Sequence, residues 1–230
     1  MPNFILFFIL LLSATPAAAA ERNYSVTDFD RIRVEGPFRI TVTTGSAVTA
    51  HAEGDARALD ALALRVDGRT LVVRMGDRGW GGFPGEVPSP PAVSLTVPSL
   101  RAVVVTGGAV VDISQMKAAR VDLTLTGSGS ITAPAIETDR LVASLIGTGR
   151  IVMSGRALTG SVQSRGAGDI DASGLIVGDL TVNSESAGEA RFNAERSVRV
   201  ISTGAGAISV AGNAACTVQS TGAAPIDCNR

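Results

Sequence analysis

Apolar and polar residues alternate along most of this chain, and glycine-containing corners interrupt the alternation at regular intervals. The clearest example is residues 121–133, VDLTLTGSGSITA, in which two short alternating segments flank Gly127-Ser128-Gly129. Strict alternation over a few residues is typical of a β-strand that buries one of its faces. The segment therefore predicts a strand, a tight corner and a second strand.

The same unit returns until the end of the sequence. Further copies of the corner begin at Gly107, Gly147, Gly166, Ser186, Gly204 and Gly222. Apolar positions that follow the corners, taken as 110, 131, 151, 170, 190, 208 and 226, lie 18 to 21 residues apart. Such a period, built from strands and glycine corners, predicts a β-solenoid with one coil per repeat.

The alternation also predicts which side chains face the inside of each coil, because residues two apart on a strand point the same way. Before the corner, one inward column is almost entirely aliphatic, and the next changes from Val105, Leu125 and Leu145 to four serines. These serines are Ser164, Ser184, Ser202 and Ser220. Buried hydroxyls need hydrogen-bond partners, and a serine or a corner backbone group one coil away can supply them. We interpret the column as a structural ladder.

After the corner, the inward positions are paired, as in Ile131/Ala133 and Ile151/Met153. The repeat that has Ala190 in place of isoleucine carries Phe192 two residues later. The volume within that coil is therefore roughly conserved, as close packing requires.

Residues 21–100 read as an N-terminal β portion that precedes the repeats of residues 101–230. Three alternating segments lie between Phe29 and Glu53, and Asp55 is placed to cap a short helix containing Leu59 and Leu62. Asp67-Gly68 then separates two apolar runs, which indicates a hairpin. The sequence thus predicts an all-β fold with one short helix.

The first twenty residues have the features of a secretory signal peptide. An apolar run from Phe4 to Leu12 is followed by Ala17-Ala18-Ala19-Ala20, a small-residue stretch typical of a cleavage site. The alternative is a membrane anchor, but the run is too short to span a bilayer. We expect cleavage after Ala20, no transmembrane segment thereafter, and a periplasmic, secreted or cell-surface location.

Composition adds two expectations. The formal net charge is −1 with mixed signs, which gives no electrostatic footprint for nucleic acid. The only cysteines are Cys216 and Cys228, and export permits a disulfide between them. Two buried thiols remain the alternative. The oligomeric state is left open.

The charged positions that follow the corners are the strongest candidates for a binding surface. Asp169 and Asp171 lie on one face, and the repeat places Arg150 one coil from Asp169 and Arg191 one coil from Asp171. Paired carboxylates on a solenoid could bind calcium or act as the acid and base of a glycoside hydrolase. We expect cross-coil ion pairs instead, since the arginines would neutralise the carboxylates.

A second candidate is the loop of residues 76–91, which carries Trp80 and Phe83 among four prolines and five glycines. These aromatic side chains either form a binding tip or fold back onto the first coil. His51, the only histidine, has no identifiable serine, cysteine or metal-ligand partner, and the cysteines do not have zinc-site spacing. We therefore predict no catalytic residues, no metal site and no cofactor.

The order of these elements resembles the head GIN domain family, whose members are labelled autotransporter adhesins. The matching stretches are residues 29–42, residues 54–71 with Val66-Asp67-Gly68-Arg69-Thr70-Leu71, residues 93–100 and the Gly-x-Gly-x-Ile repeats. The resemblance implies a secreted or periplasmic, right-handed, single-stranded parallel β-helix with an N-terminal β portion. It carries over no catalytic residues.

Together these observations favour an exported, non-enzymatic β-solenoid with an adhesin-like, polymer-binding or structural role. Its expected partner is an envelope or extracellular polysaccharide or a surface protein. The alternative is a polysaccharide lyase or hydrolase that uses Asp169, Asp171 and a nearby arginine.

Overall fold

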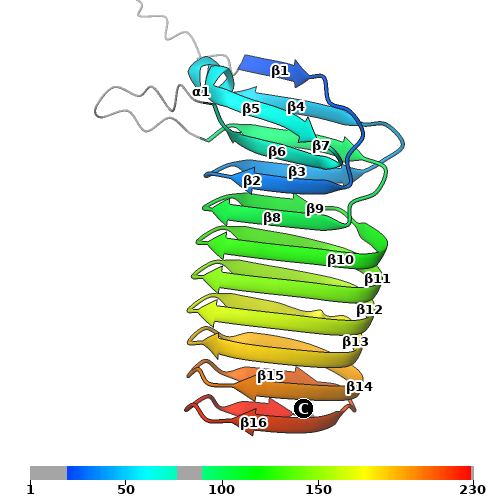
Figure 1. The fold of residues 1–230 in the computed structure, drawn as a ribbon, viewed down its shortest axis with the longest axis vertical. Helices are drawn as coiled ribbons and strands as arrows, with labels where there is room; N and C mark the ends of the chain where they lie inside the picture. The colour runs from blue at the N-terminus through cyan, green and yellow to red at the C-terminus, as the bar shows by residue number, and fades with distance from the viewer. Residues whose placement is uncertain (1–19, 77–89, 229–230) are drawn as a thin grey trace, which may run out of the picture.

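The computed structural model describes residues 20–76 and 90–228 and shows a parallel β-solenoid of about six turns. One 17-stranded sheet contains every strand of these residues, and one short helix lies at its N-terminal end (Figure 1). The elements are β1 (Ala20–Tyr24), β2 (Arg31–Glu35), β3 (Arg39–Thr44), β4 (Thr49–Gly54), α1 (Ala56–Ala61), β5 (Leu62–Asp67), β6 (Thr70–Met75), β7 (Ala92–Val97), β8 (Ala102–Gly107), β9 (Val110–Ile113), β10 (Met116–Gly127), β11 (Ser130–Gly147), β12 (Arg150–Gly166), β13 (Asp169–Ser186), β14 (Ala190–Ser202), β15 (Ile208–Ala211), β16 (Ala215–Ser220) and β17 (Ile226–Cys228).

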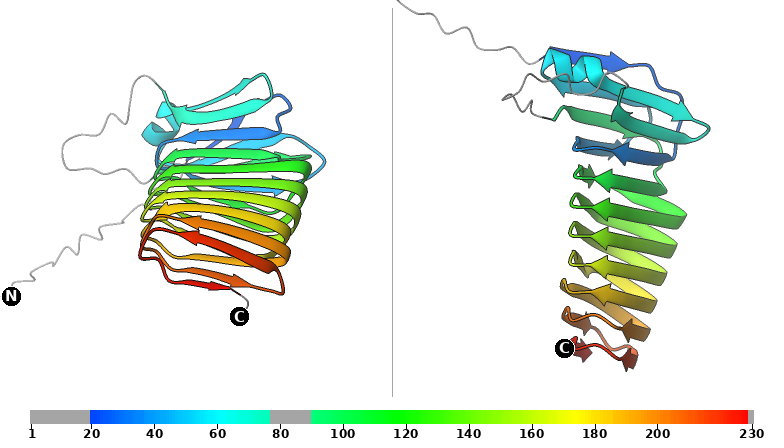
Figure 2. Two further views of the ribbon diagram at one scale, coloured as in Figure 1. Left: turned by 60° about the horizontal axis from the view of Figure 1, so that its bottom comes forward. Right: turned by 60° about the vertical axis from the view of Figure 1, so that its left-hand side comes forward.

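Each coil has two broad faces that meet at the glycine corner. We call the outer surface of the strands that lead into the corners the pre-corner face, and that of the strands that leave them the post-corner face. Successive coils stack in parallel, and the strands leading into the corners run in the opposite direction to those leaving them (Figures 1 and 2). The chain winds right-handedly along the stack (Figure 1), so the predicted fold class is confirmed.

The strand register confirms the predicted repeat with one exception. Ile131, Ile151 and Ile170 are neighbours in successive coils, as expected. The first repeat was misaligned by one residue, because Val111, and not Val110, pairs with Ile131. Val111 is fully buried and Val110 is half-buried, so the spacing between these two coils is 20 residues.

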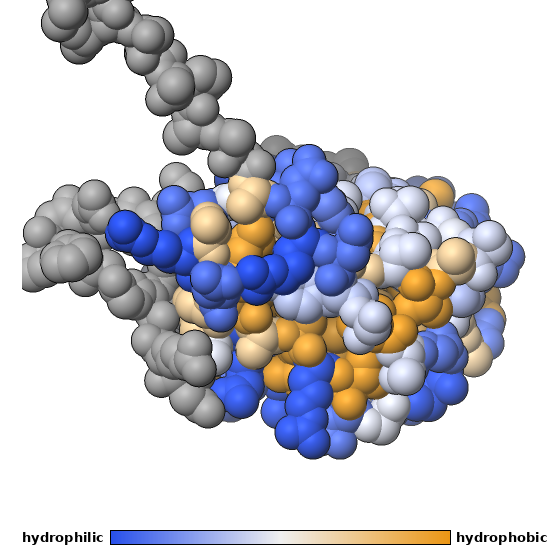
Figure 3. Space-filling view, turned by 90° about the horizontal axis from the view of Figure 1, so that it is seen from above, coloured by the Kyte–Doolittle hydropathy of each residue, from blue (hydrophilic) through white to orange (hydrophobic). Residues whose placement is uncertain are grey.

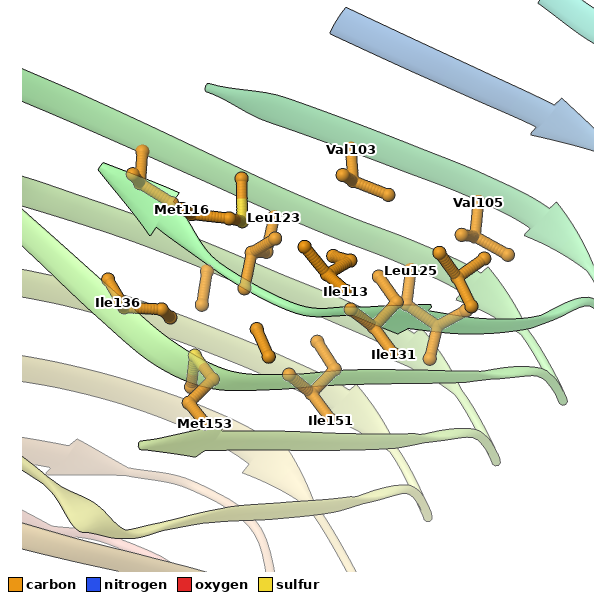
Figure 4. Close-up of a cluster of buried hydrophobic side chains, with 14 of the residues drawn as sticks. Val103, Val105, Ile113, Met116, Leu123, Leu125, Ile131, Ile136, Ile151 and Met153 are labelled. Carbon is orange, nitrogen blue, oxygen red and sulfur yellow. The ribbon is translucent and has the colours of Figure 1, made fainter. Parts of the chain in front are cut away.

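The interior is a continuous stack of aliphatic side chains from both faces. In Figure 4, Val103, Leu123 and Leu125 from the strands before the corner lie opposite Ile131 and Ile151 from the strands after it. All five side chains are at most 1% exposed. Phe192 is also buried, as the predicted compensation for Ala190 requires.

The serine column is buried as predicted, except at its last member. Ser164, Ser184 and Ser202 are buried, whereas Ser220 is exposed because no coil follows it among the described residues. The expected cross-coil hydrogen bonds do not form at Ser164, Ser184 or Ser202 among the described residues, and the Ser202 Oγ is buried without a partner. A different serine, Ser186, does bond to a corner one coil away. Ser186 occupies the position of a corner glycine, and its hydroxyl donates to the carbonyl of Gly166 at 3.3 Å.

The N-terminal strands already belong to the solenoid. Strands β2 and β3 are joined through Gly36 and stack directly on β8 and β9, which occur about seventy residues later in the chain. On their other side they pair with β6 and β7. The intervening chain therefore leaves the stack, adds a coil above β2 and β3, and returns below them.

Antiparallel strands and α1 cover the N-terminal end of the stack. Strand β5 pairs with β6, and β1 and β4 extend the other face beyond β7. The predicted hairpin at Gly68 and the Asp55 cap of α1 are both present, and Asp55 accepts a 2.8 Å hydrogen bond from the Arg57 N–H. The prediction that Leu62 lies in the helix was wrong, because the helix ends at Ala61 and Leu62 begins β5. Seen from this end, polar side chains surround areas of apolar surface (Figure 3).

A buried carboxylate joins three coils near this end. Asp30 directly precedes β2, and its side chain is 10% exposed. Arg69 Nε, from the coil above, donates to Asp30 Oδ2 at 2.9 Å. Arg101 Nε, from the coil below, lies 2.9 Å from the same oxygen, but without hydrogen-bond geometry, so that contact is an ion pair only.

Burial by itself raises the pKa of the Asp30 carboxyl, but Arg69 and Arg101 outweigh burial and lower the pKa below its ordinary value. Asp30 therefore stabilises the fold fully above the unfolded-state pKa of about 4, and this contribution is lost as the pH falls through the lower folded-state pKa. We expect Asp30→Asn to cost about 2 kcal/mol at neutral pH. Urea unfolding of the native protein and the variant between pH 7 and pH 2 measures the difference in their free energies of unfolding and its pH dependence.

The matched control is Asp28→Asn, because Asp28 is 57% exposed and lies 3.5 Å from Arg69. It should lower the free energy of unfolding by less than about 1 kcal/mol. Equal losses in the two variants would show that the burial of Asp30 contributes nothing.

A disulfide joins Cys216 of β16 to Cys228 of β17, as the sequence permitted. Cys216 pairs with the buried Val198 and Cys228 with the buried Val210, so the bond crosses the inside of the last described coil. Other inward side chains of this coil are open to solvent, and Val218 is 45% exposed. The disulfide therefore ties the two faces together where no further coil covers the core.

Candidate binding surface

The post-corner face carries most of the side chains that the sequence singled out. Its outward residues lie in columns parallel to the solenoid axis, and adjacent strands are about 4.8 Å apart. One column runs through Thr41, Asp112, Thr132, Val152, Asp171 and Arg191. The face is thus a flat ladder of mixed polarity.

The register places Arg150 beside Asp169 and Asp171 beside Arg191, as predicted. The predicted ion pair between Asp171 and Arg191 is present at 3.9 Å. The one predicted between Arg150 and Asp169 is not, because Arg150 reaches diagonally to Asp171, with Nη2 3.8 Å from Oδ2. Asp169 instead accepts a 2.9 Å hydrogen bond from the Glu189 N–H of the next coil. The long guanidinium side chain can reach either acid, so the register alone does not choose its partner.

Asp171 is the centre of this group. Its Oδ1 accepts hydrogen bonds from the hydroxyl of Ser173 at 2.7 Å and from the Ser173 N–H at 3.2 Å. Its Oδ2 lies 3.8 Å from Arg150 and 3.9 Å from Arg191, which also pairs with Glu189 at 2.7 Å. We call Arg150, Asp169, Asp171 and Arg191 the charged quartet.

These contacts keep Asp171 ionised. The Ser173 hydroxyl has the largest effect and lowers the pKa of the Asp171 carboxyl. Burial raises that pKa, but the Ser173 N–H and the charges of Arg191 and Arg150 lower it further, so it lies below its ordinary value. The general acid of a glycoside hydrolase needs a raised pKa. The environment of Asp171 therefore does not suit that role.

A shallow hollow lies on the same face, closer to the N-terminal end. It has a volume of about 210 Å³ and is formed where β3, β9 and β11 lie side by side. Asp112 stands between Thr41 and Thr132 in this hollow, and Pro134 borders it. The sequence pattern did not predict this hollow; its only signal was the column of two threonines around an aspartate.

The other sequence candidates contribute little to this surface. Trp80 and Phe83 lie outside the described residues, as does the segment predicted to be a signal peptide apart from Ala20, which begins β1. His51 contacts only Asn23, with Nδ1 3.0 Å from Oδ1, among the interactions that the structure shows. Within residues 20–76 and 90–228, no three His, Cys, Asp or Glu side chains are grouped to hold a metal ion.

The fold and the flat polar face define a β-solenoid of the kind used for extended binding surfaces. The chain belongs to the family described as "Putative auto-transporter adhesin, head GIN domain", whose model matches residues 28–214. The resemblance drawn from the sequence is therefore confirmed. No curated protein matches the sequence.

Solved structures share the fold. A crystal structure described as a putative adhesin from Bacteroides fragilis has a TM-score of 0.85 at 20% identity, covering 92% of this chain and 97% of its own. One described as a putative lipid binding protein from Parabacteroides distasonis has a TM-score of 0.71 at 20% identity, with coverage of 94% and 98%. A putative adhesin from Parabacteroides merdae has a TM-score of 0.69 at 18% identity, with coverage of 94% and 98%.

None of the helices in the described part of the chain is long and apolar enough to cross a membrane.

Proposed function

We propose that this protein is an exported, non-enzymatic, adhesin-like solenoid that binds an extended envelope or extracellular polymer along its post-corner face. The observation that carries the proposal is the arrangement of the charged quartet. Its acids are bound to backbone, hydroxyl and guanidinium groups, while Arg150 and Arg191 remain 54% and 47% exposed. The face therefore offers fixed polar groups to a ligand and no free acid–base pair.

The geometry of the solenoid supports an extended ligand. Outward side chains, most of them polar, recur along the axis at the spacing of the coils, so a polymer lying along the stack meets a new contact at each coil. Many weak contacts in series give avidity that no single contact supplies. Family membership supports the adhesin-like role, and the leader-like residues 1–20 support export to the periplasm, the medium or the cell surface.

Co-sedimentation with insoluble envelope and extracellular polysaccharides tests the role of the quartet. We expect the double variant Arg150→Gln/Arg191→Gln to bind a polymer that retains the native protein about fivefold more weakly, because two exposed charged contacts are lost. Arg165→Gln is the matched control, since Arg165 is 61% exposed and paired with Glu185 on the pre-corner face. Equal weakening by both changes would remove the quartet from the binding surface.

The alternative function is cleavage of a polysaccharide by Asp169 and Asp171. Asp171→Asn would abolish such an activity, whereas a protein that only binds releases no sugar with or without this change. If the native protein releases reducing sugar and Asp171→Asn does not, polysaccharide cleavage is established.

A further inference from the structure

We propose that the hollow around Asp112 is a subsite for one uncharged sugar unit of the bound polymer, with the Asp112 carboxylate accepting hydrogen bonds from neighbouring hydroxyl groups of the sugar. This inference rests on the proposed polymer-binding function and names the ligand class and the residue that selects it. It concerns a different set of side chains from the charged quartet.

Asp112 differs from the neighbouring acids of the post-corner face in having no partner among the described residues. The other acids of the post-corner face between β9 and β14 are engaged: Asp169 with the Glu189 N–H, Asp171 with Ser173 and two arginines, and Glu189 with Arg191. The Asp112 side chain is exposed, and the described residues supply it with no hydrogen bond or ion pair. Its oxygens are free to accept hydrogen bonds from a ligand.

The side chains around the Asp112 carboxylate add further hydrogen-bonding groups. Thr41 on β3 and Thr132 on β11 flank Asp112 on adjacent strands, each about 4.8 Å away along the stack. An ionised carboxylate accepts several hydrogen bonds, and a threonine hydroxyl both donates and accepts. Two adjacent sugar hydroxyls can therefore be bound together, while Pro134 offers an apolar surface to the C–H groups of the ring.

The hollow is held in shape by hydrogen bonds between the ends of β3 and β9. Ser114 Oγ accepts a 3.0 Å hydrogen bond from the Thr44 N–H, and the Thr44 hydroxyl donates to the Gln115 carbonyl at 3.0 Å. These bonds fasten the end of β9 to the end of β3, and the buried Val42 and Ile113 lie behind the hollow. A preformed site loses little conformational entropy when a ligand binds.

The carboxylate also determines which sugars fit. An anionic sugar would place its own carboxylate near Asp112, and this repulsion is not relieved by an ion pair from the protein. Uncharged hydroxyl-rich units have no such cost. The site should therefore distinguish neutral polysaccharides from polyuronates.

Affinity electrophoresis in native gels tests the subsite, with glucan, mannan, galactan, xylan or polygalacturonate as the soluble polymer in the gel. We expect at least one neutral polymer to retard the native protein more strongly than polygalacturonate does. Asp112→Ala should weaken that retardation about tenfold or more, through the loss of charge-assisted hydrogen bonds. Asp139→Ala is the control, because Asp139 is an exposed acid outside the hollow, and it should behave as the native protein.

Each other outcome counts against the subsite and is distinguishable from failure of the proposed function. Retardation that Asp112→Ala leaves intact, or retardation by polygalacturonate alone, overturns the subsite while polymer binding stands. Absence of retardation in every gel, together with absence from the pellet of every insoluble polysaccharide, overturns both. A thermal melt of Asp112→Ala that matches the native protein excludes misfolding as the cause of lost binding.

Discussion

Replacement of Gly166 by alanine is expected to lower the free energy of unfolding by about 3 kcal/mol or more. Gly166 has φ +110°, a conformation that residues with a side chain rarely adopt. A Cβ atom there would lie 2.5 Å from the carbonyl oxygen of Gly147 in the neighbouring coil. That oxygen accepts a 2.9 Å hydrogen bond from the Ala167 N–H, so separating the coils to admit the methyl group would also break a bond of the stack.

Gly68 provides the matched control, because it also has positive φ, +60°, but no atom lies within 4 Å of the position of its Cβ. Gly68→Ala should cost only about 1 kcal/mol, the conformational part of the effect. Urea unfolding of the two variants separates conformation from contact between coils. Similar losses at both positions would mean that the corners tolerate side chains and that the coils are not held at close approach.

Removal of the disulfide is the second change with a large expected effect. Cys216 and Cys228 are 12 residues apart in sequence, and closing a loop of this length stabilises a fold by about 3 kcal/mol in the chain-entropy account. We expect the double variant Cys216→Ser/Cys228→Ser to lose about that amount. In a solenoid each coil contacts only its neighbours, so the loss should fall mainly on the last coil.

Hydrogen exchange locates this effect. Amides of β16 and β17 should exchange faster in the double variant, while those of β10 and β11 should be unchanged. Reductant should lower the thermal stability of the native protein and leave that of the double variant as it is. Identical melting of the native protein with and without reductant would contradict a stabilising role for the bond.

The alternation of the sequence was sufficient to predict the strands, the corners and most of the inward positions. It failed at Val110 and Val111, because two adjacent valines satisfy the pattern equally and only pairing with the next coil distinguishes them. It also did not show that Gly36 is a corner of the same stack. The next coil along the stack comes about seventy residues later, so the local period is hidden.

The sequence predicted the surface less completely than the core. Register follows from the repeat, so the cross-coil positions of Arg150 and Asp169 were predictable. Which acid pairs with Arg150 depends on the length of the arginine side chain and on the hydrogen bond that the Glu189 N–H already donates to Asp169. The hollow at Asp112 depends on the depth left between neighbouring side chains, which no linear pattern records.

The most direct test of the central claim is co-sedimentation of the purified protein with a panel of insoluble envelope and extracellular polysaccharides, with released sugar assayed in the supernatant. A protein that binds an extended polymer without cleaving it is predicted to appear in the pellet of at least one polysaccharide while no sugar is released. Release of sugar would contradict the non-enzymatic role and direct attention to Asp169 and Asp171. Protein that remains in the supernatant with every polymer would contradict polysaccharide binding itself.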